Sequence, residues 1–306
     1  MVSNTRHRKR ISNDLISQPY IIKSNIILPA IEEKGLNKEL PHKCEICKEQ
    51  SLRSFGKKDF GHAGNDYFSG NRTFNDYGIS IPYSECMNCG FIFTHLFDHW
   101  GPINFIQHIY NEEYHLADPP FIMERPLKNA EMILHLLHHI PHLSTIIDIG
   151  GGDGQLSHFL RDRGVESYSY DPHFGEVDTF PAEKKFDVIT SFEVIEHVPH
   201  CQQKKWMERL ANFMHSDKLS LAVVSTEIKD ATHDITWWYI CPRNGHISIH
   251  TLKSLTYLAA SYGLNVLQLS NSLFLLCKPK WMQKIINFSL HKIIKLDTAS
   301  KLHAID

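Results

Sequence analysis

The residues best suited to chemistry lie between positions 145 and 197, where acids and glycines follow apolar runs. Asp148 lies in a β-branched run, and glycines follow it at positions 150, 151, 152 and 154. Glycine lets the backbone approach a ligand closely and adopt positive φ, and the N-terminus of the helix that follows offers free N–H groups to negative or polar atoms. Asp171 ends the next short strand, predicted at Ser167–Tyr170, where it can accept hydrogen bonds from both ribose hydroxyls. The pattern predicts a nucleoside-binding site.

The spacing of these glycines distinguishes between classes of nucleotide site. A dinucleotide fingerprint, G-x-G-x-x-G, needs a third glycine where the sequence has Gln155. A P-loop needs Gly-Lys-Ser/Thr, and no such triplet follows the glycines. The pattern that remains is Asp148-x-Gly150-x-Gly152-x-Gly154. The alternative to a ligand site is a glycine turn in some other α/β protein.

This pattern resembles the glycine loop of the class I S-adenosylmethionine (SAM) dependent methyltransferases. In that family the loop holds the methionine end of SAM and the acid after the second strand holds the ribose, which implies these roles for residues 148–154 and for Asp171. The family's E-V-I-E-H-V motif, which often follows its fourth strand, is matched by Glu193–Val198. The resemblance implies a SAM site bordered by Phe192, with Glu193 and His197 near the transferred methyl group.

Four of the seven cysteines form two C-x-x-C pairs, Cys44 with Cys47 and Cys86 with Cys89. Zn²⁺ binds four thiolates at tetrahedral corners, and two such pairs supply them from two tight turns. Gly90 suits the second turn. In a reducing compartment, paired C-x-x-C units indicate metal before disulfide. We therefore expect a structural Zn²⁺ in a zinc ribbon, with redox dithiols or two free thiol pairs as the alternative.

Two further segments carry candidate substrate contacts. The long loop between the cysteine pairs holds His62, Asp66, Tyr67 and Tyr77, and long loops in compact domains are often functional. We expect these side chains either to reach a substrate or to be structural or exposed to solvent.

The segment Trp237–His250 mixes aromatic and polar side chains around a glycine. In related small-molecule methyltransferases a histidine after the fifth strand points into the active site, which implies that position for His246. Imidazole titrates near neutrality, so His246 is the first candidate for a general base, and a hydrogen-bonded core histidine is the alternative. Arg243 is a candidate to bind a phosphate or carboxylate of the substrate through two hydrogen bonds.

The elements that position these residues follow from the hydrophobic pattern. Helical patterns lie before Asp148, directly after the glycines, and at 201–215 and 251–262. The stretch between Asp171 and Phe186 is short, so Glu176–Asp178 is the candidate for an abridged third strand. The fold class is α/β, a Rossmann-like sheet with a small N-terminal zinc-ribbon module and, as in the resembled family, a closing antiparallel hairpin; its strands are predicted at 145–149, 167–170, 186–191, 219–226, 264–269 and 273–277.

A helix with apolar residues at helical spacing is predicted to begin at Arg125. In methyltransferases that resemble this chain, a helix before the glycine strand covers the SAM pocket, and nearby tyrosines and an arginine often touch the cofactor. This implies cofactor contacts for Tyr110, Tyr114 and Arg125. The segment Asp118–Phe121 resembles a motif of base-directed amino-methyltransferases, but no strand precedes it, which argues against that function.

Length and composition describe an ordinary globular protein with one large and one small domain. A net charge of −2 argues against nucleic acid as a partner. The sequence shows neither a membrane-spanning run nor a signal peptide, so we expect a cytoplasmic protein. The expected organisation is an extension at 1–40, a zinc module at 41–98, a linker with the covering helix at 99–144, a SAM-binding domain at 145–280 and a helical tail at 281–306, docked on the body or on a second subunit.

We therefore expect a SAM-dependent methyltransferase that acts on a small molecule by in-line methyl transfer. A four-cysteine zinc domain joined to a class I domain resembles the bacterial C-methyltransferases of nucleotide-activated deoxysugars. This implies a nucleotide-linked sugar or a cell-surface glycan precursor as the acceptor. The first alternative is an RNA or protein methyltransferase whose zinc ribbon binds the macromolecule, and the second is a non-catalytic binding module that keeps the fold.

Overall fold

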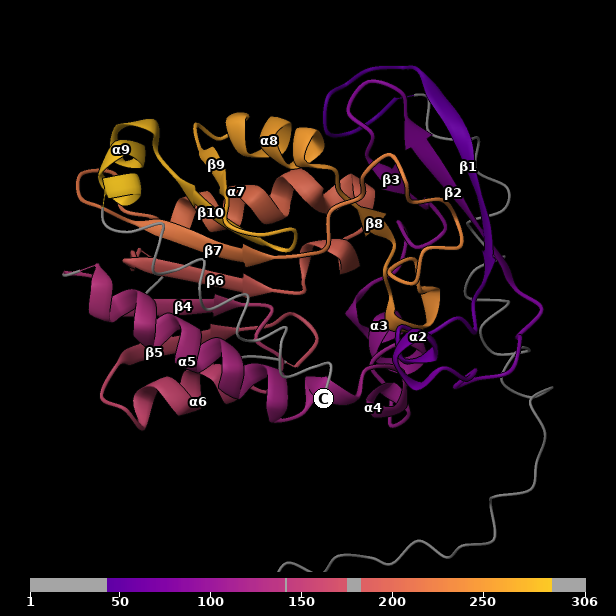
Figure 1. Cartoon of the computed structure of the whole chain (residues 1–306), viewed down its shortest axis with the longest axis horizontal. Coiled ribbons are helices and arrows are strands. Elements are labelled where there is room, and N and C mark those ends of the chain that lie inside the picture. Colours follow the sequence, from indigo (N-terminus) through magenta and orange to yellow (C-terminus); the bar gives the residue numbers. More distant parts are fainter. Residues whose placement is uncertain (1–42, 141, 175–182, 288–306) are drawn as a thin grey trace, which may run out of the picture.

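The computed structural model describes residues 43–140, 142–174 and 183–287. A six-stranded sheet flanked by helices lies beside a second sheet of four antiparallel strands (Figure 1). The predicted N-terminal extension, the third-strand candidate Glu176–Asp178 and most of the predicted tail lie outside the described residues.

The larger sheet has the mixed topology that the sequence predicts. The first four strands in its spatial order are parallel, whereas β10 is antiparallel to both of its neighbours. This confirms the Rossmann-like sheet and the antiparallel hairpin that closes it. In spatial order its strands are β5 (Glu166–Tyr170), β4 (Thr145–Ile149), β6 (Val188–Phe192), β7 (Leu221–Ser225), β10 (Leu273–Cys277) and β9 (Asn265–Gln268).

Helices cover both faces of this sheet, with α5 and α6 on one side and α7 and α8 on the other (Figure 1). Successive side chains of a strand point to opposite faces. Ile146 therefore lies in the core formed with α5 and α6, and Ile147 lies in the core formed with α7 and α8. The helices are α5 (Glu124–His139), which is the predicted covering helix, α6 (Gln155–Arg161), α7 (Gln203–Phe213), α8 (Leu252–Ala260) and α9 (Pro279–Asn287).

The smaller sheet is assembled from distant parts of the sequence. Three of its strands come from the predicted zinc module, but β8 pairs with β3 through Ile249 opposite Ile92 and Ser248 opposite Phe93. The sheet therefore draws on both predicted ranges, 41–98 and 145–280. Its strands are β1 (Leu52–Asp59), β2 (Ser80–Cys86), β3 (Ile92–Phe93) and β8 (Ser248–Ile249).

A separate hydrophobic core joins this sheet to the segment after β7. It combines Ile81 and Phe97 from the N-terminal half with Tyr239 and Ile247 from the C-terminal half, all of them buried. The same region contains short helices: α2 (Asn65–Ser69), α3 (Pro102–His108), α4 (Tyr114–Ala117), and the 3-10 turns η2 (Pro119–Phe121), η3 (Ile195–His197), η4 (His200–Gln202) and η5 (Pro242–Asn244). The segment Trp237–His250, which carries candidate substrate contacts, is thus packed against the N-terminal module.

The start of the predicted tail forms α9, which packs on the body of the protein. Ile285 is buried in the core that also contains Ile133 and Leu275. Within the described ranges, no helix has both the length and the apolar composition needed to cross a bilayer.

Candidate cofactor site and cysteine cluster

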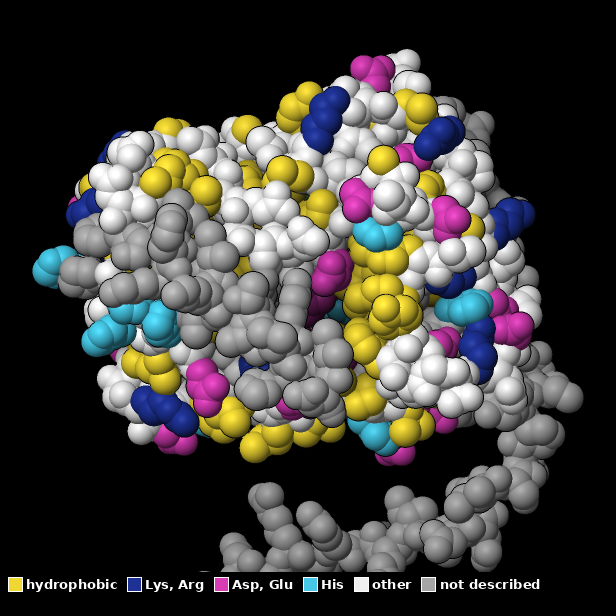
Figure 2. Space-filling view, in the orientation of Figure 1, with side chains coloured by type: hydrophobic (Ala, Val, Ile, Leu, Met, Phe, Trp, Pro, Cys, Tyr) yellow, Lys and Arg dark blue, Asp and Glu magenta, His cyan; other side chains and the backbone are white. Residues whose placement is uncertain are grey.

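A cavity of about 300 Å³ lies at the carboxyl ends of β4, β5 and β6, which is where open α/β sheets bind ligands. Figure 2 shows acidic side chains in the hollow between the two parts of the molecule. Gly154 does not line the cavity; it caps α6 with a φ of +84°. Of the predicted catalytic residues, Glu193 and His197 line the cavity and His246 does not. The predicted cofactor residues that line it are Asp148, Gly150, Gly152, Asp171, Phe192, Tyr114 and Arg125.

Backbone conformation and close packing explain why the loop after β4 contains glycine. Gly150 has a φ of +79°, and a Cβ atom there would lie 2.5 Å from Cγ2 of Val194. Any side chain would therefore meet both backbone strain and a steric clash. Gly152 has a φ of +57°, and its N–H donates to Oδ2 of Asp171 at 3.0 Å. The loop backbone lines the cavity and is tied to the acid after β5.

Asp148 is buried beneath the loop with little compensation for its charge. Its Oδ1 accepts a hydrogen bond from Thr190 Oγ1 at 2.6 Å. Burial raises the pKa of Asp148 from 3.8 to about 7, because desolvation outweighs the hydrogen bond from Thr190. The carboxyl group is therefore protonated over part of the neutral pH range, when it can donate a hydrogen bond as well as accept one.

Asp171 accepts backbone hydrogen bonds on both oxygens. Oδ2 accepts from Gly152, and Oδ1 accepts from the N–H groups of His173 at 2.7 Å and Phe174 at 3.3 Å. Burial raises the pKa of Asp171, and the backbone donors partly offset that effect. These bonds hold the carboxylate in a fixed orientation at the cavity wall.

Aromatic residues from the predicted linker form the opposite wall. Tyr114 is buried and packs edge-on against Tyr110 and Phe121, with ring centroids 5.1 and 5.2 Å apart. Arg125 donates two hydrogen bonds to Asp118, at 2.8 and 2.7 Å. Asp118 of the Asp-Pro-Pro-Phe segment is therefore the ion-pair partner of the covering helix, which gives that segment a structural role.

Glu193 lies directly after β6 in an uncommon backbone conformation. Its φ is +53°, a value that few non-glycine residues adopt and that is frequent at functional sites. Its carboxylate accepts hydrogen bonds from Ser225 Oγ at 2.7 Å and from Tyr239 Oη at 3.0 Å. Tyr239 is not among the residues that the sequence predicts at the site, and its only signal is its place in the aromatic segment after β7.

Glu196 and His246 lie behind the cavity wall and form a cluster with His197, which lines the cavity. The rings of His197 and His246 lie 4.8 Å apart, and His197 Nε2 is 3.8 Å from Glu196 Oε1. His246 Nδ1 is 2.7 Å from the carbonyl oxygen of Tyr239. Burial lowers the pKa of His246 to about 3 and the pKa of His197 well below its usual range, and it raises the pKa of Glu196. The base function of His246 stays a prediction. Glu196 is not among the predicted site residues, although it lies within the matched E-V-I-E-H-V motif.

The structure contradicts the prediction that Arg243 binds a charged group of the substrate. Arg243 is only 1% exposed and does not line the cavity. Its guanidinium donates to the carbonyl oxygen of Ile109 at 3.0 Å and to Asn111 Oδ1 at 2.9 Å. Both donor groups are used inside the protein, so Arg243 ties η5 to the segment after α3.

The loop between the cysteine pairs does not reach the cavity either. Asp66 accepts hydrogen bonds from the N–H groups of Ala63 and Thr73, at 3.1 and 2.7 Å. Tyr67 stacks on Trp238 with ring centroids 5.6 Å apart. The loop residues His62, Asp66, Tyr67 and Tyr77 are absent from the cavity wall. They serve instead to pack the loop on itself and on the segment after β7.

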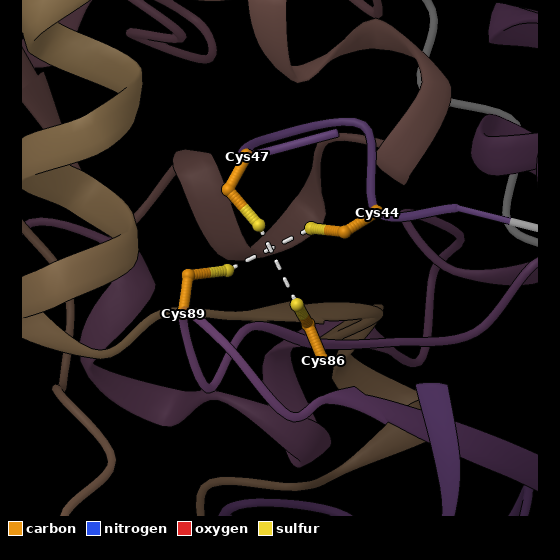
Figure 3. Close-up of side chains that lie close together, drawn as sticks. All are labelled: Cys44, Cys47, Cys86 and Cys89. Carbon is orange, nitrogen blue, oxygen red and sulfur yellow. Dashed lines mark hydrogen bonds between the residues drawn. The ribbon is translucent and has the colours of Figure 1, made fainter. Parts of the chain in front are cut away.

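The cysteine pairs come together as the sequence predicts, with all four side chains pointing toward one centre (Figure 3). Cys44 and Cys89 have sulfur atoms 3.7 Å apart, and Cys47 and Cys86 have sulfur atoms 3.5 Å apart. Sulfurs bound to one tetrahedral ion at about 2.3 Å lie about 3.8 Å apart, whereas a disulfide needs about 2.05 Å. All four cysteines are free thiols, and their spacing fits a shared metal ion.

Comparison with known proteins finds one family model that matches part of the chain. Residues 121–269, just under half of the chain, match a family model described as a methyltransferase domain. The matched range contains the larger sheet up to β9, the glycine loop and most of the cavity wall. A search of the curated proteins found no match.

Solved structures with a similar arrangement are distant from this chain. Magnesium protoporphyrin IX methyltransferase from Synechocystis is 14% identical over 51% of this chain and 85% of its own, with a TM-score of 0.38. The 1,6-didemethyltoxoflavin-N1-methyltransferase of Burkholderia thailandensis is 14% identical over 57% and 84%, with a TM-score of 0.39. An O-methyltransferase family protein from the same organism is 13% identical over 57% and 62%, with a TM-score of 0.43.

Proposed function

We propose that this protein is a SAM-dependent methyltransferase that acts on a small molecule. The observation that carries the proposal is the hydrogen bond between Gly152 and Asp171, which joins the glycine loop and the acid after β5 on one cavity wall. A Cβ atom at Gly150 would clash with Val194, so this position requires glycine. A glycine loop lets its backbone approach a ligand closely. When bound, SAM supplies a methyl group on a sulfonium.

The residues of this chain have distinct tasks in that reaction. Gly150 and Gly152 present backbone to the methionine end of the cofactor, and Asp171 accepts from the ribose hydroxyls. Tyr114 and Arg125 close the opposite wall, and Phe192 borders the cavity beside β6. The walls exclude water and align the acceptor with the methyl group, which is the main catalytic requirement because the leaving group is good.

The acceptor is expected beside Glu193 and His197, which line the cavity next to the end of β6. The net charge of −2 gives no support for a nucleic-acid acceptor, so a small molecule is the first candidate. We propose a polar acceptor, of which a nucleotide-linked sugar or a glycan precursor is the first candidate. Cytoplasmic location is proposed with it, since such precursors are made there.

A methyl-transfer assay tests this function. Protein is incubated with methyl-labelled SAM and separate pools of nucleotide sugars, glycans, small acids, RNA and protein, and the label is followed. Label in a small molecule supports the proposal, and label in RNA or protein would favour the macromolecular alternative. Absence of SAM binding by calorimetry at millimolar concentration would contradict the proposal and favour a non-catalytic binding module.

We also propose that Cys44, Cys47, Cys86 and Cys89 hold one structural Zn²⁺. Sulfur separations of 3.5 and 3.7 Å support this assignment. Lys48 and Gly90, the residues that follow each pair, have positive φ values of 65° and 73°. Each pair therefore lies in a tight turn that directs both thiolates to the same side. Four protein ligands leave no open position, so the site is structural and not catalytic.

A further inference from the structure

A second group of metal-ligating side chains lies far from the cysteines in sequence. Glu196 and His197 belong to η3, and His246 follows η5. Their potential ligand atoms all lie within 4.8 Å of one another. Donor atoms around one ion with bonds of about 2.1 Å lie about 3–4 Å apart, so the cluster is close to ligand spacing.

The polar atoms of this cluster lack the partners that buried groups normally have. Glu196 is completely buried, and neither of its carboxylate oxygens makes a hydrogen bond of normal geometry within the described structure; its polar neighbours are the hydroxyl of Tyr239 and the carboxylate of Glu193. Nδ1 of His197 is likewise buried and without a partner. A buried carboxylate without compensation costs several kcal/mol, and buried polar groups are nearly always paired. The cluster is therefore incomplete as a set of protein groups alone.

The surrounding hydrogen bonds orient the cluster as outer-shell groups orient metal ligands. His246 Nδ1 lies 2.7 Å from the carbonyl oxygen of Tyr239, which can only accept, so Nδ1 carries the proton and Nε2 presents a lone pair. Metal-bound histidines usually donate their second ring nitrogen in this way. The hydroxyl of Tyr239 donates to Glu193, so one residue positions both the histidine and the neighbouring acid.

We propose that Glu196, His197 and His246 bind a first-row divalent cation at the inner end of the cofactor cavity. Two imidazoles and one carboxylate are ligands that such ions accept. Three protein ligands leave coordination positions open. His197 lines the cavity, so the open positions can face a bound acceptor. His246 is then a metal ligand, which replaces its expected function as a base.

The cation site also indicates the chemical class of the acceptor, an inference that rests on the proposed methyltransferase function. A divalent cation lowers the pKa of a bound hydroxyl. The hydroxyl proton passes to solvent, and the cation-bound oxygen attacks the methyl carbon with its lone pair. The carbon–oxygen bond forms as the carbon–sulfur bond breaks, and its electron pair remains on sulfur to give S-adenosylhomocysteine. The acceptor atom is therefore an oxygen of a hydroxyl group.

Mn²⁺ titration of the full chain tests the cation site without an activity measurement. The electron paramagnetic resonance signal of free Mn²⁺ decreases on binding, and one saturable ion per chain is expected. Glu196→Gln and His246→Gln should each weaken binding at least tenfold. Glu85→Gln is the control, because Glu85 is also buried but pairs with Arg53 and Lys229 outside the cluster. Circular dichroism and S-adenosylhomocysteine binding report whether each variant is folded.

Electron spin-echo spectra of Mn²⁺ bound to the wild-type protein test the ligands without any variant. Modulation from imidazole nitrogens is expected if His197 and His246 are ligands. Absence of saturable Mn²⁺ binding, spectra without nitrogen modulation, or Mn²⁺ affinity that a folded Glu196→Gln variant retains would each overturn the site. Mn²⁺ binding without any SAM binding would instead contradict the proposed function and leave the cation site intact.

Discussion

At the scale of single residues, the two acids of the proposed cofactor site have different environments. Asp171 accepts three backbone hydrogen bonds at the cavity wall, whereas Asp148 lies beneath the loop with one hydroxyl donor. The backbone donors partly offset the effect of burial on the pKa of Asp171, whereas burial dominates at Asp148 and raises its pKa to about 7.

Asp171→Ala should weaken S-adenosylhomocysteine binding by about tenfold to a hundredfold, because hydrogen bonds to a charged group contribute about 1.5–3 kcal/mol. Isothermal titration calorimetry measures the affinity. Asp162→Ala is the control, since Asp162 is exposed at the end of α6. Unchanged affinity in a folded Asp171→Ala variant would contradict the ribose-binding function.

Asp148 should make the stability of the protein depend on pH. Its pKa rises from 3.8 to about 7 on folding, so the folded state binds more protons than the unfolded state between these values. Its contribution to stability is complete below pH 3.8 and is lost as pH rises to about 7. The slope is at most about 1.4 kcal/mol per pH unit. Asp148→Asn should reduce that slope in urea unfolding measured from pH 5 to 8. An unchanged slope would contradict the raised pKa of Asp148 in the folded state.

At the scale of elements, α8 connects the cysteine cluster to the larger sheet. Thr251 caps its N-terminus by accepting from Ser254 N, and its hydroxyl donates to the carbonyl oxygen of Cys89 at 2.5 Å. A Cβ atom on Gly90 would lie 2.7 Å from Cγ2 of Thr251. The second cysteine turn is therefore packed closely against the start of this helix.

Thr251→Ala should lower the free energy of unfolding by about 1–2 kcal/mol, because it removes both the helix cap and the hydrogen bond to Cys89. Thr251→Ser keeps the hydroxyl and should lose much less. Urea denaturation of both variants makes the comparison. Equal losses would show that packing of the Thr251 methyl group, and not its hydroxyl, contributes to the free energy of unfolding.

At the scale of the whole molecule, the two sheets share their cores. Cys44, Cys86 and Cys89 are buried in the same core as Ile147 and Met207 of the larger sheet and its helix α7. In the other direction, β8 lies within the range 121–269 that matches the family model, but it pairs with β3 to complete the smaller sheet. The cysteine cluster should therefore stabilise the chain as a whole and not only its N-terminal part.

Purified protein should contain about one zinc per chain, and chelation should lower the midpoint of thermal unfolding of the entire protein in a single transition. Cys47→Ser should have the same effect and reduce the zinc content. Metal analysis and calorimetry provide the measurements. A zinc content near zero would exclude the proposed site, and a separate low-temperature transition would show that the module unfolds independently.

The sequence by itself determined the features that depend on short stretches of chain. Glycine spacing, the acids that end strands and the hydrophobic periods are local, so they identified the loop at 150–154, Asp171 and the strands of the larger sheet. The C-x-x-C pairs likewise fixed which thiols would meet, because each pair already lies in one turn. The mixed sheet and its closing hairpin followed from the same patterns and the family resemblance.

Only the tertiary structure decided contacts between segments that are distant in sequence. No local pattern indicates that β8 pairs with β3 or that Glu196 lies near His246. Nor does any indicate that the guanidinium of Arg243 donates its hydrogen bonds to Ile109 and Asn111. A side chain's type limits what it can bind, but its neighbours decide whether its donors are already used. The residues of the proposed cofactor wall could therefore be predicted from the sequence, whereas the groups proposed to surround the acceptor come together only through packing between the two halves of the chain.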